Sequence, residues 1–297
     1  MVGRDGSWAA SDAVGARAAL VIAAIAALGV LAPVAHARSS ATAALQVALR
    51  AKGVYDGTVD GIRGPATREG VRRFQARRGL SVDGIAGPHT RRALGWRGRH
   101  RLGSRVIGPG RRGWDVSQVQ WLLATRGFAN GAFDGSFGPR GEAALQRFQA
   151  WAGLGADGLA GPATISALRR PPPRSILRFA WPLSVPVGDG FGPRGNTFHT
   201  GIDLPAPSGT PVGAAGHGCV IQAGYDSGGY GNLVIVQHRL GMTSWYAHLS
   251  RISVNVGECV VAGSRIGRVG ATGHATGPHL HFELRLRGAA VDPLSGL

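Results

Sequence analysis

The sequence between residues 44 and 168 repeats itself, and this repeat limits the fold of the first half of the chain more than any other feature. When the sequence is shifted by the 74 residues that separate Gln46 from Gln120, many identical residues align without a gap. So many identities at one spacing indicate a duplication, and we predict two copies of one small unit. The aligned pairs include Gly53 and Gly127, Asp60-Gly61 and Asp134-Gly135, Gly64-Pro65 and Gly138-Pro139, Phe74-Gln75 and Phe148-Gln149, Asp83-Gly84 and Asp157-Gly158, and Gly87-Pro88 and Gly161-Pro162.

Each copy is predicted to fold as a helix, a turn, a second helix, a turn and a short third helix. The Asp-Gly pairs are typical of turns. Each Gly-Pro pair puts proline at the first position of a helix, where the missing N–H is not needed. A unit of about 50 residues is marginally stable alone, so the two copies are expected to support each other. The predicted stripes on the central helices are Val71, Phe74 and Arg78 in the first copy, and Leu145, Phe148 and Ala152 in the second.

Both copies resemble peptidoglycan-binding modules of the small three-helix type. The D-G…G-P…F-Q…G-L…D-G…G-P-x-T…L pattern carries this resemblance over about residues 44–94 and 115–168. The resemblance implies that the modules bind peptidoglycan, although most of the quoted residues are expected to be turn or core positions. We predict module 1 at residues 38–98 and module 2 at 99–170, followed by a proline-rich linker at 171–180.

The positive charge of the chain is concentrated in these modules. The whole chain has a net charge of +17, and residues 38–175 hold 23 basic and 8 acidic residues, a net charge of +15. Such a charge predicts an anionic partner. Anionic wall polymers fit this expectation beside peptidoglycan itself. A nucleic acid is not expected, because the chain has neither a Cys/His finger nor an aromatic RNP strand.

The N-terminus has the features of an export signal. An apolar run from Ala18 to Ala35 precedes Ala35-His36-Ala37, an A-x-A cleavage pattern. We therefore predict a signal peptide at residues 1–37, a secreted protein of the cell wall or periplasm, and no stable membrane span after cleavage. An uncleaved anchor is the alternative, although Gly29 and Pro33 interrupt the run. Export permits a disulfide between Cys219 and Cys259, but two reduced, buried cysteines fit the sequence equally well.

After residue 176 the pattern changes to short β-rich runs separated by glycine-rich turns. This alternation predicts a mainly antiparallel β domain at residues 181–297. The fold class is therefore multidomain, with two small three-helix α modules followed by this β domain. The predicted strands are Cys219–Ala223, Leu233–His238, Met242–His248, Ile252–Val256, Ile266–Val269 and Leu280–Leu286.

Three histidine clusters in this β domain point to a metal site. His199 and Asp203 are four residues apart and are expected at the start of a strand and in the loop before it, because Gly201 and Pro205 argue against a helix. His279 and His281 lie two apart on a predicted strand, so their imidazoles share one face. Imidazole and carboxylate groups are good ligands for Zn²⁺, and a catalytic zinc keeps one position open for water.

The segments around these clusters resemble the lysostaphin-type, LytM-like zinc endopeptidases, which cut peptide cross-links in bacterial cell walls. The H-x-x-x-D element is met by His199 and Asp203 and the H-x-H element by His279 and His281, while FGPRG, GTPVGAA, GGYGN, YAHLS and GSRIGRVGATG match in order. The resemblance implies that His199, Asp203 and His281 bind Zn²⁺. It also implies that His279 and His248 are the two catalytic histidines.

Three further residues are predicted to bind substrate. Tyr230 and Asn232 are expected to line the substrate groove or to serve as turn and strand-start residues. Arg194 is expected to steer a peptide carboxylate or to pair with an acid. The prediction for the whole chain is a secreted zinc endopeptidase that hydrolyses peptide bonds in peptidoglycan. The alternatives are a catalytically silent LytM-like wall-binding protein or hydrolase activator, a binding protein built on the basic segment, and a peptidase that acts on proteins.

Overall fold

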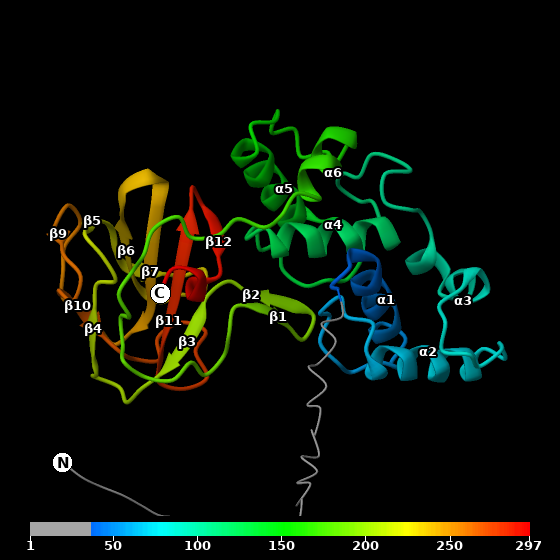
Figure 1. The fold of residues 1–297 in the computed structure, drawn as a ribbon, viewed down its shortest axis with the longest axis horizontal. Helices are drawn as coiled ribbons and strands as arrows, with labels where there is room; N and C mark the ends of the chain where they lie inside the picture. Colours follow the sequence, from blue (N-terminus) through cyan, green and yellow to red (C-terminus); the bar gives the residue numbers. More distant parts are fainter. Residues whose placement is uncertain (1–36) are drawn as a thin grey trace, which may run out of the picture. The chain divides into compact units, whose positions relative to one another are not determined.

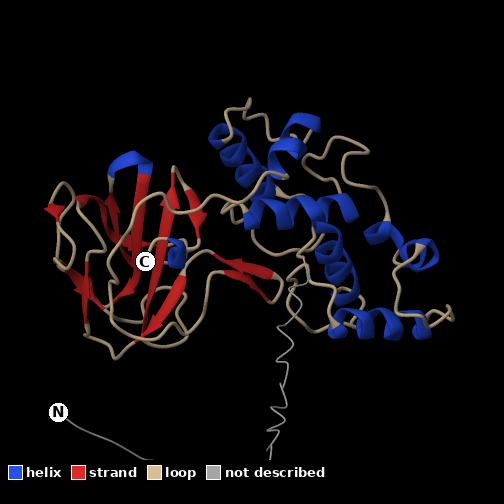
Figure 2. Ribbon diagram, viewed as in Figure 1, coloured by secondary structure: helices blue, strands red, loops and turns tan. Residues whose placement is uncertain are grey.

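The computed structural model describes residues 37–297, so the predicted signal peptide lies outside the described residues except for Ala37. Within this range no helix has both the length and the apolar character needed to cross a membrane. The described residues belong to one compact unit of the chain. Its first part contains six α-helices. Figures 1 and 2 show these helices followed by a part made mainly of β-strands.

The helical part confirms the predicted duplication. The first copy contains α1 (Ser40–Arg50), α2 (Pro65–Arg77) and α3 (Pro88–Ala93), and a short 3-10 helix, η1 (Gly95–Gly98), follows it. The second copy repeats the order with α4 (Trp114–Thr125), α5 (Pro139–Trp151) and α6 (Pro162–Leu168). As predicted, α2, α3, α5 and α6 each begin with a proline that follows a glycine N-cap.

Four glutamines explain why the Asp-Gly pairs recur. Gln46 donates from Nε2 to Asp60 Oδ1 at 2.7 Å, and its Oε1 accepts from the Gly61 N–H at 2.9 Å. Gln75, Gln120 and Gln149 make the same pair of contacts with the Asp-Gly turns that follow them. The buried amide therefore ties each turn to a helix, and most of the repeated letters are structural.

The two copies pack against each other through their first helices, α1 and α4 (Figure 1). Val47 of α1 belongs to the same buried cluster as Val119 and Leu123 of α4. Helix α4 is buried along nearly its whole length, with Trp121 only 5% exposed. This shared core agrees with the expectation that neither small module is self-sufficient.

The second part is a mainly antiparallel β domain, as predicted. Its main sheet has the order β12-β11-β7-β6-β5-β9, with β3 also paired with β11. The strands of this sheet are β3 (Ile202–Pro205), β5 (Gly218–Asp226), β6 (Gly231–Gln237), β7 (Met242–Leu249), β9 (Cys259–Val260), β11 (His279–Leu286) and β12 (Ala289–Val291). A hairpin of β1 (Gly192–Arg194) and β2 (Thr197–His199) precedes it, and β4 (Pro211–Gly213), β8 (Arg251–Ile252) and β10 (Arg265–Arg268) form a small second sheet.

The predicted strand Ile252–Val256 is wrong in its extent. Strand β8 ends at Ile252, because the chain turns around Gly257, which has a φ of +88°. The side chain of Glu258 accepts from the backbone N–H of Asn255 at 3.0 Å and closes this turn. The apolar residues of the segment serve the loop instead, and Val254 is buried in the core.

One face of the main sheet packs into the apolar core, and the opposite face carries the histidines. Leu280, Phe282 and Leu284 of β11 are fully buried in the main apolar cluster. The alternating residues of the same strand, His279, His281 and Glu283, therefore lie on the opposite face.

The two cysteines form a disulfide, which decides the alternative that the sequence left open. Cys219 of β5 and Cys259 of β9 are direct partners in the antiparallel register. They are 40 residues apart in the sequence, and β9 is the last strand in the sheet order. The bridge therefore fastens an edge of the sheet.

The two helical copies contact the β1–β2 hairpin through equivalent positions. The backbone N–H of Val59 donates to the carbonyl of Gly195 at 2.8 Å, and that of Phe133 donates to the carbonyl of Asn196 at 2.7 Å. Val59 and Phe133 are separated by the 74 residues of the duplication. The same backbone group in each copy thus holds neighbouring residues at the tip of the hairpin that ends in His199.

Candidate metal centre

The first two candidate ligands come from consecutive short strands. His199 is the last residue of β2 and Asp203 is the second residue of β3, and the two strands are separated by Thr200 and Gly201. Gly201 lies tightly against β11: a Cβ there would sit 2.4 Å from the carbonyl oxygen of Phe282. The absence of a side chain at position 201 lets the turn pack on β11. The sequence allowed His199 to lie in the loop before a strand, but His199 is itself a strand residue.

Strand pairing brings the third candidate ligand to the same place. In the antiparallel register of β3 and β11, Asp203 lies directly opposite His281. Directly opposed residues on one face have Cβ atoms about 5 Å apart, within reach of a hydrogen bond. The predicted alternation of His279 and His281 on one face is confirmed, since His279 Nε2 lies 3.6 Å from Asp203 Oδ1 and His281 Nδ1 lies 2.8 Å from it.

Three ligand atoms converge on one point. His199 Nε2 lies 3.1 Å from Asp203 Oδ1 and 3.0 Å from His281 Nδ1. Together with the 2.8 Å between His281 Nδ1 and Asp203 Oδ1, these distances form a triangle. Donor atoms about 2.0–2.1 Å from a tetrahedral zinc would lie about 3.3 Å apart. His199, Asp203 and His281 are the group within the described residues that could hold a metal ion.

The hydrogen bonds around the two imidazoles turn their lone pairs toward this point. His199 Nδ1 donates to the Gly190 carbonyl at 2.8 Å, and His281 Nε2 lies 3.0 Å from a carboxylate oxygen of Glu283. In the neutral tautomers that these bonds select, the remaining nitrogens have no proton. Two lone pairs and a carboxylate then face one another, so a positive charge is needed between them.

A proton or a metal ion can supply that charge. Burial disfavours the charged form of His281, but the carboxylates of Asp203 and Glu283 outweigh burial and raise its pKa to about 9. Burial also disfavours ionised Asp203, yet hydrogen bonds from His199 and His281 hold its pKa well below the ordinary value. A metal ion would displace the proton from this cluster, as is general for metal sites. The donor set and its spacing therefore fit a divalent cation.

His248 reaches the site because β7 is irregular. The pairing register of β6 and β7 shifts between Asn232 and Val234, and His248 has a φ of +62°, which is uncommon for a residue other than glycine. Tyr246, two residues earlier, points into the core. In a regular strand His248 would share the face of Tyr246, so the irregularity redirects it toward His279, whose ring centroid lies 4.8 Å away.

His248 and His279 each keep one nitrogen free. His248 Nδ1 donates to the Thr272 carbonyl at 2.8 Å, and His279 Nδ1 donates to the Gly277 carbonyl at 2.9 Å. The Nε2 atoms of both neutral rings are then proton acceptors. Burial lowers the pKa of His248, which favours its neutral form.

Glu283 is a fully buried carboxylate behind the candidate ligands. Besides His281, it accepts from Thr200 Oγ1 at 2.6 Å, from Tyr230 Oη at 2.9 Å and from Arg285 Nε at 2.6 Å. Burial would raise the pKa of Glu283, but the charge of Arg285 and the bond from His281 hold it well below the ordinary value. The sequence placed Glu283 on the right face by alternation, whereas no sequence signal identified Thr200 or Arg285.

A cavity of about 370 Å³ opens over the site, and the predicted substrate residues take different positions around it. Arg194 and Tyr230 line this cavity. Arg194 Nη1 also pairs with Asp189 at 2.7 Å and lies 3.6 Å from Asp203 Oδ2. Asn232 is not among the lining residues, because its side-chain amide donates to the Leu249 carbonyl. Substrate contact by these three residues stays a prediction.

Comparison with known families agrees with this geometry. The model of "Peptidase family M23" matches residues 197–293, a range that holds both strands of candidate ligands and His248. The model of "Putative peptidoglycan binding domain" matches residues 38–94 and 112–168. The chain combines one peptidase family M23 domain with two peptidoglycan-binding-type domains. The resemblance to LytM-like proteins is thereby confirmed.

The M23 domain is also similar to curated bacterial proteins. It is 47% identical over 115 residues to the DD-carboxypeptidase/endopeptidase Mpg of Neisseria meningitidis serogroup B, an alignment that covers 38% of this chain and 26% of that protein. It is 44% identical over 96 residues to the peptidoglycan DD-endopeptidase ShyA of Vibrio cholerae, covering 32% of this chain and 22% of that protein. The chain thus spans about a quarter of the length of these relatives.

The M23 domain also matches solved structures. The catalytic domain of the peptidase lysostaphin from Staphylococcus simulans is 38% identical, and the match covers 37% of this chain and 90% of that chain with a TM-score of 0.35. A zinc-containing peptidase from Vibrio cholerae is 35% identical, covering 39% of each chain with a TM-score of 0.37.

Proposed function

We propose that this protein is a zinc-dependent endopeptidase that hydrolyses peptide bonds in bacterial peptidoglycan. The observation that carries this proposal is the triangle of His199 Nε2, Asp203 Oδ1 and His281 Nδ1, whose sides measure 2.8 to 3.1 Å. The match of this domain to peptidase family M23 and its similarity to relatives named as endopeptidases support it.

We propose zinc as the metal because two imidazoles and one carboxylate are a donor set that zinc prefers. Bound zinc supplies a Lewis acid that polarises a peptide carbonyl and lowers the pKa of a water near it. Three protein ligands leave a coordination position free for that chemistry. His199 and His281 are held for the task by Gly190 and Glu283, so little reorganisation is needed on binding.

His279 and His248 are proposed as the catalytic histidines. The free Nε2 of His279 lies near the ligand cluster and takes the proton of the attacking water. His248 contacts the attacked carbonyl or the developing oxyanion. Because its Nδ1–H is committed to the Thr272 carbonyl, His248 donates from Nε2 only as the imidazolium. The proton that His279 takes from the water would then pass to the amine that leaves, so the hydrolysis step is balanced.

Arg194 and Tyr230, which line the cavity, are the proposed substrate contacts, and Asn232 is proposed to support the groove from behind. Arg194 is 55% exposed in its side chain and stands at the cavity, where it suits a peptide carboxylate. The ring of Tyr230 packs 5.9 Å from that of His281, while its hydroxyl is committed to Glu283. Tyr230 therefore offers an apolar wall. The backbone N–H of Asn232 donates to the Thr272 hydroxyl and its side-chain amide to the Leu249 carbonyl, so Asn232 holds the loop that carries Thr272.

The two helical domains are proposed to hold the enzyme on the wall, and peptidoglycan and anionic wall polymers are their proposed partners. Attachment raises the effective concentration of substrate without changing the chemistry. The protein is then secreted and works in the cell wall or periplasm. The proposed domain limits are residues 38–98, 99–170 and 181–297, with the signal peptide before them and the linker at 171–180.

Metal analysis combined with digestion of purified peptidoglycan tests this function. The full chain is expected to contain one zinc ion and to release muropeptides that mass spectrometry identifies as products of peptide cleavage. Chelation should stop the release and added Zn²⁺ should restore it. His281→Ala removes a ligand and should lower the rate about a thousandfold, since a Lewis acid contributes several kcal/mol.

His217→Ala is the matched control, because His217 lies in the same domain and outside the cavity. This variant should keep both the metal and the activity. Wall digestion that survives His281→Ala would reject the proposal and favour a silent binding protein with a contaminating hydrolase. Cleavage of glycine-rich proteins in preference to muropeptides would assign the site to a different substrate class.

A further inference from the structure

A second and larger cavity lies where the second helical domain meets the M23 domain. We call it the junction pocket, and its volume is about 810 Å³, within the range of sites that bind small molecules. Its lining residues come from the start of the described chain and of α1, from α4, from the segment 169–174, from the β1–β2 hairpin and the residue before it, and from the C-terminal segment. Those used below are Arg38, Trp121, Arg126, Arg174, Phe198 and Asp292.

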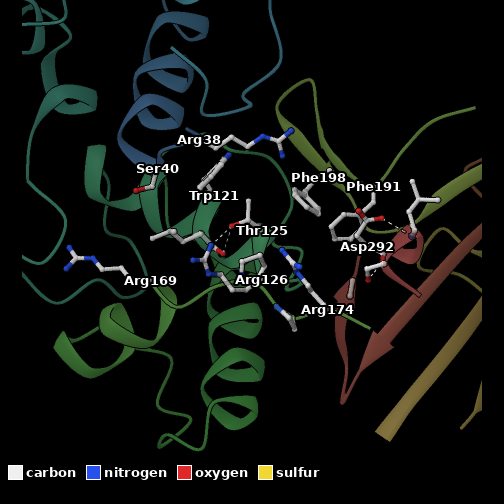
Figure 3. A pocket seen from close by; sticks show the side chains of 17 residues that line it. Arg38, Ser40, Trp121, Thr125, Arg126, Arg169, Arg174, Phe191, Phe198 and Asp292 are labelled. Atoms are coloured by element: carbon white, nitrogen blue, oxygen red, sulfur yellow. Dashed lines mark hydrogen bonds between the residues drawn. The ribbon is translucent and has the colours of Figure 1, made fainter. Parts of the chain in front are cut away.

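The junction pocket is positively charged. Four arginines line it, and Asp292 is the one acid among its lining residues. Asp292 already caps a short helix, since its Oδ1 accepts from the Leu294 N–H at 3.0 Å. In Figure 3 three of the arginines, Arg38, Arg126 and Arg174, lie around the space that separates Trp121 from Phe191 and Phe198.

Arg126 is a buried cation with no acidic partner within residues 37–297. Only 9% of the residue is exposed, and its guanidinium donates to the Thr125 hydroxyl and the Arg170 carbonyl, both of them neutral. Its Nε has no hydrogen-bond partner among the described residues, and neither has Nε1 of buried Trp121. Burying an unpaired charge is costly, and burial lowers the pKa of this arginine. The site is therefore suited to an anion that also offers acceptor atoms.

The junction pocket adjoins the cavity of the metal centre. Phe198 lines both cavities, and the next residue is the candidate ligand His199. A polymer with its scissile bond at the metal centre can therefore extend past Phe198 to the arginines. The proposed substrate is such a polymer, because peptidoglycan joins sugars to peptides that bear free carboxylates.

We propose that the junction pocket binds a carboxylate-bearing segment of the same peptidoglycan molecule whose peptide is cut at the metal centre. This inference rests on the proposed function. The arginines bind the carboxylates through charge-assisted, bidentate hydrogen bonds. Trp121 and Phe198 give the apolar walls that most ligand sites have, and the small number of polar groups fixes the orientation of the ligand. Contacts remote from the scissile bond would then raise the affinity for wall fragments of the correct charge.

Binding is measured without cleavage, on the full chain after chelation of its metal. Soluble muropeptides with free carboxylates are titrated by calorimetry, and the same muropeptides are then titrated after their carboxylates have been amidated. The double variant Arg38→Gln/Arg174→Gln removes two exposed charges and should fold normally. We expect its Kd for the free muropeptides to rise about tenfold, the loss of roughly one charge-assisted hydrogen bond. For the amidated muropeptides its Kd should equal that of the wild type.

The matched control is Arg251→Gln/Arg265→Gln, which removes the same charge from β8 and β10 of the small sheet, whose residues do not line the pocket. This pair should leave both Kd values unchanged. An equal loss in the control pair would overturn the proposal, because a long-range field would then explain the binding. Tighter binding of poly(glycerol phosphate) than of muropeptides, lost in the double variant, would also overturn it and assign the pocket to phosphate polymers.

The two proposals fail separately in these experiments. A protein that binds muropeptides through the arginines but digests no wall contradicts the zinc endopeptidase and leaves the junction pocket in place. If the wild type digests wall and the double variant binds muropeptides with the same Kd as the wild type, only the junction pocket proposal is contradicted.

Discussion

Each histidine of the metal centre has one nitrogen committed to a neighbour, and this commitment determines what the other nitrogen does. Backbone carbonyls of Gly190, Thr272 and Gly277 hold His199, His248 and His279, whereas His281 is held by a carboxylate. A carboxylate partner makes an imidazole a stronger metal ligand than a carbonyl partner does. Glu283 is therefore a positioning residue for His281, and the charge of Arg285 keeps Glu283 ionised.

Glu283→Gln should weaken zinc binding by about 10- to 100-fold, because the amide keeps the shape of the carboxylate but loses its charge. Competition with a chelator of known affinity measures this change directly, without an activity assay. Glu258→Gln, at an exposed glutamate in a turn of the same domain, is the control and should bind zinc as the wild type does. An unchanged zinc affinity in Glu283→Gln would show that Glu283 serves only the packing of the sheet.

The Asp-Gly turns of the helical domains predict a pH dependence of stability. Hydrogen bonds from the backbone N–H groups of Ile85 and Leu159, followed by those from Gln75 and Gln149, hold the pKa values of Asp83 and Asp157 below the ordinary aspartate value of 3.8. Because the folded-state pKa lies below the unfolded-state one, the stabilisation is complete above the unfolded-state pKa of about 3.8 and is lost as the pH falls from there through the folded-state pKa.

The unfolding temperature of the helical signal should therefore decrease below about pH 3.8 in the wild type. The double variant Asp83→Asn/Asp157→Asn keeps an acceptor without a titrating proton and should give a flatter curve. Circular dichroism at several pH values measures both. The control is Asp56→Asn, at an exposed aspartate, which should follow the wild type. Parallel curves for all three proteins would contradict the role of the turns.

At the scale of elements, periodicity predicted what depends on regular backbone and missed what depends on its exceptions. The alternation of β11 placed His279, His281 and Glu283 on one face, and each Gly-Pro pair marked a helix start. His248 reaches the site through a register shift and a positive φ, for which the sequence has no signal. The strands β1, β2, β4 and β12, of three residues each, were missed because so few alternations carry no signal, whereas a strand near Asp203 was expected.

The disulfide was left open because its decisive quantity is a distance between strands. Register makes Cys219 and Cys259 direct partners on β5 and β9, which a sequence with a 40-residue gap cannot reveal. The bridge should stabilise the domain by about 4 kcal/mol on the chain-entropy model for a loop of this length.

Cys219→Ser/Cys259→Ser should therefore unfold at lower denaturant, with a free energy of unfolding reduced by about 4 kcal/mol relative to the oxidised wild type. Wild type kept in a strong reductant should match the variant, which separates the loss of the bridge from the effect of serine. Zinc content should be unchanged, because neither cysteine lines the cavity of the metal centre. Equal stability of the oxidised wild type and the variant would mean that the unfolded chain is already restricted between residues 219 and 259 without the bridge.

At the scale of the whole molecule, contacts between the helical domains and the M23 domain lay beyond sequence reasoning because backbone groups and remote pairs form them. The N–H groups of Val59 and Phe133 carry no side-chain signature. Trp151 Nε1 donates to the Leu286 carbonyl at 3.1 Å, across 135 residues of sequence. The sequence predicted a proline-rich linker at residues 171–180, which stays a prediction, and it gave no sign of contacts across it. The N–H groups of Val59 and Phe133 tie the two helical copies to the β1–β2 hairpin, and Trp151 ties α5 to β11.

Cleavage of the chain in the segment 171–174 tests whether these contacts hold the parts together. With a protease site inserted there, the two fragments should co-elute in gel filtration at micromolar concentration, because buried apolar contacts supplement the hydrogen bonds. Trp151→Ala removes one of these contacts and should make the fragments separate at lower concentration. Immediate separation of the unsubstituted fragments would mean that the wall-binding part is only tethered. Co-elution would mean that wall binding by the helices also positions the hairpin of the metal centre.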